Sequence, residues 1–231
     1  MNEFKIRCSA ISKIMGPLQG GLTDKQRDKL EMYQGRNSQC KERFELEEKL
    51  KEPVSLGKGA KSYCEEWIMS EVYGSQPVFD RKMEKGNRLE DDAIRFMGYE
   101  PQHKTRMSDN YLSGECDLLL DEAIVDIKCP WSHTTFPILE TELPEKAYWW
   151  QGQGYMHLYK RKHYRVAYVL MTTPADLDEY GLNYDNLPKH LRIKTFEFDY
   201  DPLAISKVEE RVRMCREYIE TLRRDLRLDE F

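Results

Sequence analysis

Apolar residues recur at the spacing of an α-helix in several stretches of the chain. Residues 59–72, 86–97 and 203–227 each carry one apolar stripe among charged positions. Such a stripe is typical of a helix that packs one side against a core and exposes the other to water. The pattern therefore predicts three amphipathic helices over these stretches.

Polar residues mark the expected starts and ends of further helices. Thr23 and Gln26 have the spacing of a capping box, which begins a charged helix running toward residue 51. Gly35 is a candidate interruption of that helix. Ser9 is expected to cap a short helix near the N-terminus. The first quarter of the chain is thus predicted to be helical.

Strand-like segments occupy the middle of the chain. Apolar and β-branched residues predict strands over about 111–120, 123–129, 164–171 and 192–200. A helix is expected between the second and third of these, from Pro144 in its first turn to about residue 159. The third and fourth strands then precede the last helix.

The order of these elements predicts the fold class. Helices, a hairpin, a helix, two strands and a final helix are typical of an α/β or α+β fold with a small mixed β-sheet flanked by helices. The 231 residues are expected to form a single domain. Within it we expect N-terminal helices over 1–75, a core over about 86–200 and a C-terminal helix over about 203–227.

Composition argues against several classes of protein. The 33% charged residues, and the absence of an apolar run near the ~20 residues that span a bilayer, favour a soluble cytoplasmic protein without a signal peptide. The six cysteines form no C-x-x-C pair, which argues against a zinc ribbon, an iron–sulfur cluster and a disulfide framework. The net charge of -5 is unlike that of a typical DNA-binding module, although a carboxylate-rich enzyme can still carry a basic groove. The basic run Arg81, Lys82, Lys85 and Arg88 is interpreted as a solvated face.

Charged residues interrupt the two apolar runs of the segment GECDLLLDEAIVDIKCP, residues 114–130. Buried charges are costly unless they are paired or bind a metal. Pairing about the turn at 121–122 would bring Asp117 and Asp126 together, with Lys128 on the same strand face as Asp126. The two carboxylates and the carbonyl of Ile127 would then supply oxygen ligands for Mg²⁺, and Lys128 could hold or deprotonate an attacking water or stabilise phosphate charge.

The spacing of these three charged residues also occurs on solvated strand faces of unrelated proteins. Four surrounding stretches favour a functional site over a solvated strand face. They are CSAISKIM (8–15), GNRLEDDA (86–93), DIKCP (126–130) and AYWWQGQGYM (147–156). Together with GECDLL they resemble, in order, the motifs of the phage lambda-type recombination exonucleases. This YqaJ-like viral recombinase family lies within the PD-(D/E)XK nuclease superfamily, and the resemblance runs over about residues 6–160.

The resemblance implies a PD-(D/E)XK core and a set of site residues. Asp117, Asp126 and the Ile127 carbonyl would bind a metal, and Glu90 would hold a second ion or its waters. Lys128 would orient the nucleophilic water. The remaining implied residues contact water, phosphate or DNA; they are Gln151, Gln153, Ser9, Ser12, Lys13, Ser132 and His133.

The resemblance also implies the reaction and its partners. The chain would be a Mg²⁺-dependent 5′→3′ exonuclease on double-stranded DNA ends, with Mn²⁺ an alternative and two ions expected. It would act in phage DNA recombination as a ring-shaped homotrimer beside a single-strand annealing protein, in the cytoplasm of a bacterial cell.

The chain departs from the family pattern at the residues expected to bind a DNA end. Glu115 stands where the family often has a serine, and no basic residue follows Pro130 closely. The cleavage centre is therefore better supported than end recognition. Two alternatives remain open, namely an endonuclease of the same superfamily and a non-catalytic DNA-binding protein with a nuclease fold.

Overall fold

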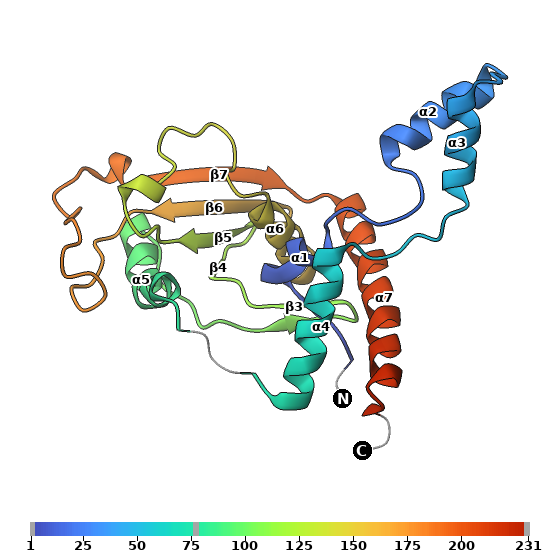
Figure 1. Cartoon of the computed structure of the whole chain (residues 1–231). Coiled ribbons are helices and arrows are strands. Elements are labelled where there is room, and N and C mark those ends of the chain that lie inside the picture. The colour runs from blue at the N-terminus through green and yellow to red at the C-terminus, as the bar shows by residue number, and fades with distance from the viewer. Residues whose placement is uncertain (1–2, 76–78, 229–231) are drawn as a thin grey trace. The chain divides into compact units, whose positions relative to one another are not determined.

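The computed structural model describes residues 3–75 and 79–228 of the chain (Figure 1). The chain forms two compact units, one comprising residues 1–12 and 73–210 and the other residues 13–72 and 211–231. The single domain expected from the chain length stays a prediction. The first unit contains the β-sheets and most of the predicted site residues.

A four-stranded mixed sheet lies at the centre of the first unit. Its strands are β4 (Leu118–Leu119), β5 (Ala123–Lys128), β6 (His163–Val169) and β7 (Ile193–Asp199), in that spatial order. Strands β5 and β6 are parallel, whereas the other two pairs are antiparallel. A parallel pair needs a crossover connection, which here contains α6 (Lys146–Tyr159). The expected mixed α/β architecture is confirmed.

One helix packs on each face of this sheet. On one face, Ala93 and Ile94 of α5 (Arg81–Met97) pack against Val125 and Ile127 of β5. On the other face, α6 approaches the sheet closely at Gly152, where an added Cβ would lie 2.7 Å from side-chain atoms of Tyr164 and Phe198. Because successive side chains of a strand point to opposite faces, β5 presents Val125 and Ile127 to α5 and Asp126 to α6.

A second, smaller sheet holds the N-terminal strand of this unit. Its strands are β1 (Ile6–Arg7), β3 (Leu112–Gly114) and β2 (Met107–Ser108), ordered β1-β3-β2. The 3₁₀ turn η1 (Cys8–Ala10) and α1 (Ile11–Ile14) follow β1 directly. Two further 3₁₀ turns, η2 (His133–Thr135) and η3 (Lys189–Leu191), lie in the connections that flank α6 and β7.

The predicted strand over 111–120 is wrong as a continuous element. The structure divides it into β3 and β4, which belong to different sheets. The break has a local cause. The Asp117 side chain accepts a hydrogen bond from a backbone N–H of β5, at the place where the backbone of a continuing strand would lie. Asp117 Oδ2 accepts the Ile127 N–H at 2.8 Å, and the ladder ends at the Leu118–Val125 pair.

Three helix starts differ from the prediction. Ser9 is not a helix cap, because the chain turns directly from β1 into η1 and Arg7 occupies the cap position. Helix α5 begins at Arg81 rather than 86, since the Asp80 carboxylate accepts the Lys82 N–H at 2.8 Å and so caps an earlier turn. Helix α6 begins at Lys146, so Pro144 precedes its first turn.

The second unit is helical. It contains α2 (Asp24–Gly35), α3 (Lys41–Leu50), nearly all of α4 (Lys58–Tyr73) and the later part of α7 (Pro202–Asp225). The capping box of Thr23 and Gln26 is confirmed, and the expected long helix is two helices, the first of which ends at Gly35. The Tyr218 hydroxyl joins α7 to α4 by donating to Glu65 Oε1 at 2.7 Å. No helix within 3–75 and 79–228 has the length and apolar character that crossing a membrane requires.

Candidate active site

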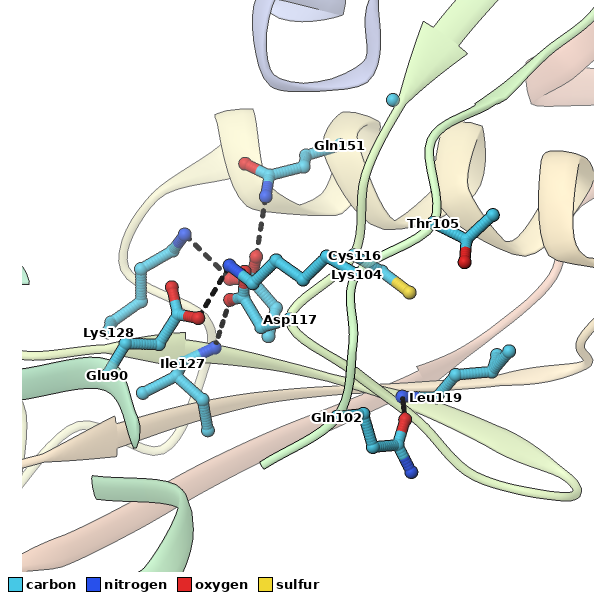
Figure 2. Close-up of polar contacts among 12 residues, drawn as sticks. Glu90, Gln102, Lys104, Thr105, Cys116, Asp117, Leu119, Ile127, Lys128 and Gln151 are labelled. Carbon is cyan, nitrogen blue, oxygen red and sulfur yellow. Dashed lines mark hydrogen bonds and ion pairs between the residues drawn. The ribbon is translucent and has the colours of Figure 1, made fainter. Parts of the chain in front are cut away.

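A pocket of about 790 Å³ opens beside the carboxyl end of β5. Its walls come from α5, β5, β6, the segment after β5 and the first half of α6. The polar side chains that the motifs single out on these walls are Glu90, Asp117, Asp126, Lys128 and Gln151. Figure 2 shows the labelled members of this group pointing toward one another. The fold therefore brings together residues that lie up to 61 positions apart, from 90 to 151.

Asp126 lies at the centre of a buried polar group. Its carboxylate accepts a hydrogen bond from Gln151 Nε2 at 2.6 Å through Oδ1, and Lys128 Nζ lies 2.7 Å from Oδ2. Burial raises the pKa of Asp126 to about 6, although the Lys128 ammonium acts in the opposite direction. Oδ2 itself accepts no hydrogen bond of suitable geometry. A buried carboxylate oxygen in this state is suited to binding a cation.

Lys128 is held in place by two neighbours. Asp126 supplies the opposite charge, and the ammonium lies 4.6 Å from the ring centroid of Tyr148 on α6. Burial alone would lower the pKa of Lys128, but the Asp126 carboxylate raises it above its ordinary value. Lys128 is therefore a charged donor at neutral pH.

Glu90 and Asp117 share a cation that the sequence motifs did not single out. Lys104 Nζ lies 2.5 Å from Glu90 Oε1 and 3.2 Å from Asp117 Oδ1 (Figure 2). Burial and the Asp117 charge raise the pKa of Glu90, and the Lys104 ammonium opposes them. Lys104 lies in the irregular segment between α5 and β2, where no periodic pattern or motif marks it.

The donor set is suited to a hard divalent cation. Carboxylate oxygens from three segments and the backbone of Ile127 line the pocket, and oxygen ligands are those that Mg²⁺ and Mn²⁺ prefer. Among the described residues, no three His, Cys, Asp or Glu side chains already form a closed cluster. The carboxylates are instead engaged by Lys104 and Lys128.

Gln153, unlike Gln151, does not line this pocket, and its expected contact with water, phosphate or DNA stays a prediction. Its Nε2 donates to the Asp199 carbonyl at 2.9 Å, and its Oε1 accepts the Asp201 N–H at 2.7 Å. Residues two apart on a helix point in widely different directions, so only Gln151 faces Asp126. Gln153 ties α6 to the end of β7.

The five predicted phosphate-binding residues do not line the pocket. Ser9 is exposed in η1 and Ser12 is partly exposed in α1. Lys13 belongs to the helical unit, where its ammonium lies 5.2 Å from the ring centroid of Tyr63. Ser132 and His133 lie in the segment after β5, but their neighbours Thr134 and Thr135 form the pocket wall. Phosphate binding by these five residues stays a prediction.

The backbone of His133 is held by Tyr184 and not by a carboxylate of the pocket. Its N–H donates to the Tyr184 hydroxyl at 3.1 Å.

Sequence reasoning also missed two pocket residues of α5. Lys82 and Asn87 line the same wall as Glu90. Asn87 lies one turn before Glu90 within the helix predicted over 86–97, so helical spacing could have indicated it. Tyr148 likewise lines the pocket, although the aromatic run of α6 is more typical of a core.

Three solved structures resemble the chain over nearly its whole length. The phage-related exonuclease of Haemophilus somnus 129PT shares 25% sequence identity, with 97% of each chain covered and a TM-score of 0.75. The alkaline exonuclease LHK-Exo of Laribacter hongkongensis shares 17% identity over 98% of this chain and 93% of its own, with a TM-score of 0.62. The structure of LHK-Exo in complex with dAMP shares 18% identity over 96% of this chain and 93% of its own, with a TM-score of 0.60.

No protein-family model matches the chain, and no curated protein sequence matches it. The structural neighbours nevertheless agree with the motifs, because both indicate the same class of nuclease. The expected resemblance to the lambda-type exonucleases is confirmed, and the chain has the fold of the phage-related and alkaline exonucleases.

Proposed function

We propose that the chain is a metal-dependent deoxyribonuclease that degrades double-stranded DNA from an end. The observation that carries the proposal is the pocket in which Glu90, Asp117, Asp126 and Lys128 meet. These are the carboxylates and the lysine that a PD-(D/E)XK nuclease needs. The exonuclease fold of the whole chain supports the same reading.

The proposed metal ligands are oxygen atoms. Asp117, Asp126 and the Ile127 carbonyl would hold Mg²⁺ or Mn²⁺, and Glu90 would hold a second ion or its waters. A bound ion would supply Lewis acidity and would lower the pKa of the attacking water. Asp126 Oδ2 is buried and already faces one cation, the Lys128 ammonium at 2.7 Å, which supports its role as a ligand.

Lys128 is proposed to orient the nucleophilic water and to stabilise charge on the phosphate. Its raised pKa keeps the ammonium protonated, so it donates hydrogen bonds instead of removing a proton. Gln151 keeps the Asp126 carboxylate in a fixed rotamer through the 2.6 Å hydrogen bond to Oδ1. Groups held in place before the reaction lower the barrier because they need little reorganisation.

The proposed reaction is an in-line hydrolysis. The water oxygen forms a bond to phosphorus while the bond to the 3′ oxygen breaks. A terminal nucleotide leaves with its own 5′ phosphate and a new 3′ hydroxyl, and the shortened strand keeps a 5′ phosphate. LHK-Exo has been solved with dAMP, a product of this chemical class.

The finer properties follow the resemblance of the motifs. We propose 5′→3′ polarity, a 3′ single-stranded tail that a phage annealing protein would receive, and a ring-shaped homotrimer. The enzyme would act in the cytoplasm of a phage-infected or prophage-bearing bacterial cell. Of these properties, the polarity can be tested by labelling either end of a DNA strand.

Digestion of linear duplex DNA tests the function directly. We expect a duplex labelled at the 5′ end to release its label early as mononucleotide, whereas a 3′ label is released late. Mg²⁺ is expected to support the reaction and EDTA to stop it. A closed circular duplex serves as the matched control, because it offers no end.

Three other results of the digestion would change the proposed activity. Nicking or linearisation of the circle would indicate an endonuclease. Early release of the 3′ label would reverse the proposed polarity. Binding without cleavage under Mg²⁺ and Mn²⁺ would indicate a non-catalytic DNA-binding protein.

A further inference from the structure

Lys104, which the proposed reaction does not use, lies between two of the pocket carboxylates. Its ammonium contacts Glu90 Oε1 at 2.5 Å and Asp117 Oδ1 at 3.2 Å. Glu90 comes from α5 and Asp117 from the residue before β4. Lys104 therefore bridges two segments whose carboxylates would otherwise face each other as like charges (Figure 2).

The segment around Lys104 is held by one hydrogen bond on each side. Gln102 Oε1 accepts the Leu119 N–H at 3.0 Å, and the Thr105 carbonyl accepts a hydrogen bond from the Tyr159 hydroxyl. The Lys104 side chain is itself 32% exposed. The backbone of Lys104 therefore need not move. Rotation of its four-carbon side chain is enough to carry the ammonium toward solvent.

The oxygens of Asp117 are already engaged. Oδ1 contacts Lys104, and Oδ2 accepts the Ile127 N–H at 2.8 Å. A divalent ion bound to Asp117 Oδ1 must therefore share that oxygen with Lys104 or displace it. An ammonium and a divalent cation on the same carboxylate repel each other, so displacement is favoured.

Lys128 is held in a different way from Lys104. It lies on β5 two residues after Asp126, and its ammonium contacts the face of Tyr148 at 4.6 Å from the ring centroid. Lys128 also contacts a proposed metal ligand, because its ammonium lies 2.7 Å from Asp126 Oδ2. Lys104 enters from an irregular segment and contacts two carboxylates, Glu90 and Asp117, whereas the ion pair of Lys128 is with Asp126.

We propose that Lys104 is an internal counter-cation that holds Glu90 and Asp117 together until a divalent ion displaces it. The inference rests on the proposed function, since it assigns the same two carboxylates to the ion. Lys104 stabilises the ion-free site and, by the same interaction, weakens the affinity for the ion. Free-energy coupling of this kind is reciprocal.

Direct titration with Mn²⁺ in the absence of DNA tests the inference. Lys104→Met removes the charge and keeps an apolar side chain of similar reach. We expect this variant to bind Mn²⁺ roughly fivefold or more tightly than the wild type, measured by isothermal titration calorimetry. In EDTA its thermal midpoint should fall, because Glu90 and Asp117 then lack their shared cation.

Two variants separate charge from structure. Lys104→Arg keeps the charge, so its Mn²⁺ affinity should stay close to that of the wild type. Lys162→Met removes an exposed charge outside the pocket and controls for the change in net charge. Lys104→Gln, which keeps a polar donor, replaces Lys104→Met if circular dichroism shows that the latter does not fold.

The possible outcomes are distinguishable. Equal or weaker Mn²⁺ affinity in the neutral Lys104 variants, beside a wild type that binds the ion and digests DNA, overturns the inference alone. Absence of Mn²⁺ binding in every variant overturns the proposed metal centre together with it. Tighter binding in Lys104→Met and not in Lys162→Met supports the counter-cation role.

Discussion

Single charged groups in the pocket differ sharply in their surroundings. Asp126 is 3% exposed and depends on Lys128 and Gln151 for partners. Glu90 and Asp117 lie nearer to solvent and share Lys104. These local environments decide which group stays charged and which responds to pH.

Replacement of Lys128 by alanine should remove the cleavage activity. The variant loses the charged donor that orients water and stabilises phosphate charge, so the cleavage rate should fall by about 100-fold or more. DNA binding, measured by fluorescence anisotropy in Ca²⁺, should change little. Lys162→Ala is the control, and a wild-type rate in Lys128→Ala would exclude the proposed role.

Acidification should weaken ion binding. Burial raises the pKa of Asp126 to about 6, so this carboxylate gains a proton as the pH falls through 6, and the proton competes with the ion. Mn²⁺ affinity should therefore be steady well above pH 6 and fall by up to about tenfold for each pH unit below it. Calorimetry between pH 5 and pH 8 measures this dependence. An affinity that does not change over this range contradicts the role of Asp126 as a ligand.

At the scale of elements, α5 carries more than the carboxylate of Glu90. The side chain of Lys85 on this helix is 0% exposed, and its ammonium donates to the carbonyls of Pro130, Trp131 and Met171 at 2.7, 3.0 and 2.8 Å. Burial lowers the pKa of Lys85 to about 8. The interpretation of the basic run as a solvated face is wrong at this position, because Lys85 fixes the segments that follow β5 and β6.

Lys85→Met should destabilise the fold. The apolar side chain fills a similar volume but leaves buried carbonyls without a donor, which costs about 1–3 kcal/mol for a single unsatisfied group. The midpoint of urea denaturation should fall accordingly. Lys82→Met, an exposed change on the same helix, is the control. An unchanged midpoint in Lys85→Met would show that the three hydrogen bonds contribute no net stability.

At the scale of the whole molecule, the residues of the pocket all come from the unit that holds the sheets. Residues 13–72 of the helical unit are inserted between the N-terminal strand and the rest of the sheet-containing unit, and its residues 211–231 follow that unit in the chain. The matches with the exonuclease neighbours cover at least 96% of this chain, residues 13–72 being about a quarter of it. The insertion therefore does not set this chain apart from them.

Local patterns in the sequence already determine much of this protein. Apolar periodicity indicates the main helices and the strands of the mixed sheet, and the order of Glu90, Asp117, Asp126 and Lys128 indicates a nuclease site. The helices and strands depend on residues close in the chain, where spacing alone decides which side chains share a face.

Tertiary structure alone decides the remaining features. Lys104 meets Glu90 and Asp117 only because separate segments fold onto one pocket, and Lys85 is buried only because two loops present carbonyls to it. The hydrogen-bond partners of Gln151 and Gln153, which are Asp126 and the Asp199 carbonyl, likewise lie far away in the chain. Contacts of this kind leave no periodic trace, because packing and not spacing brings the groups together.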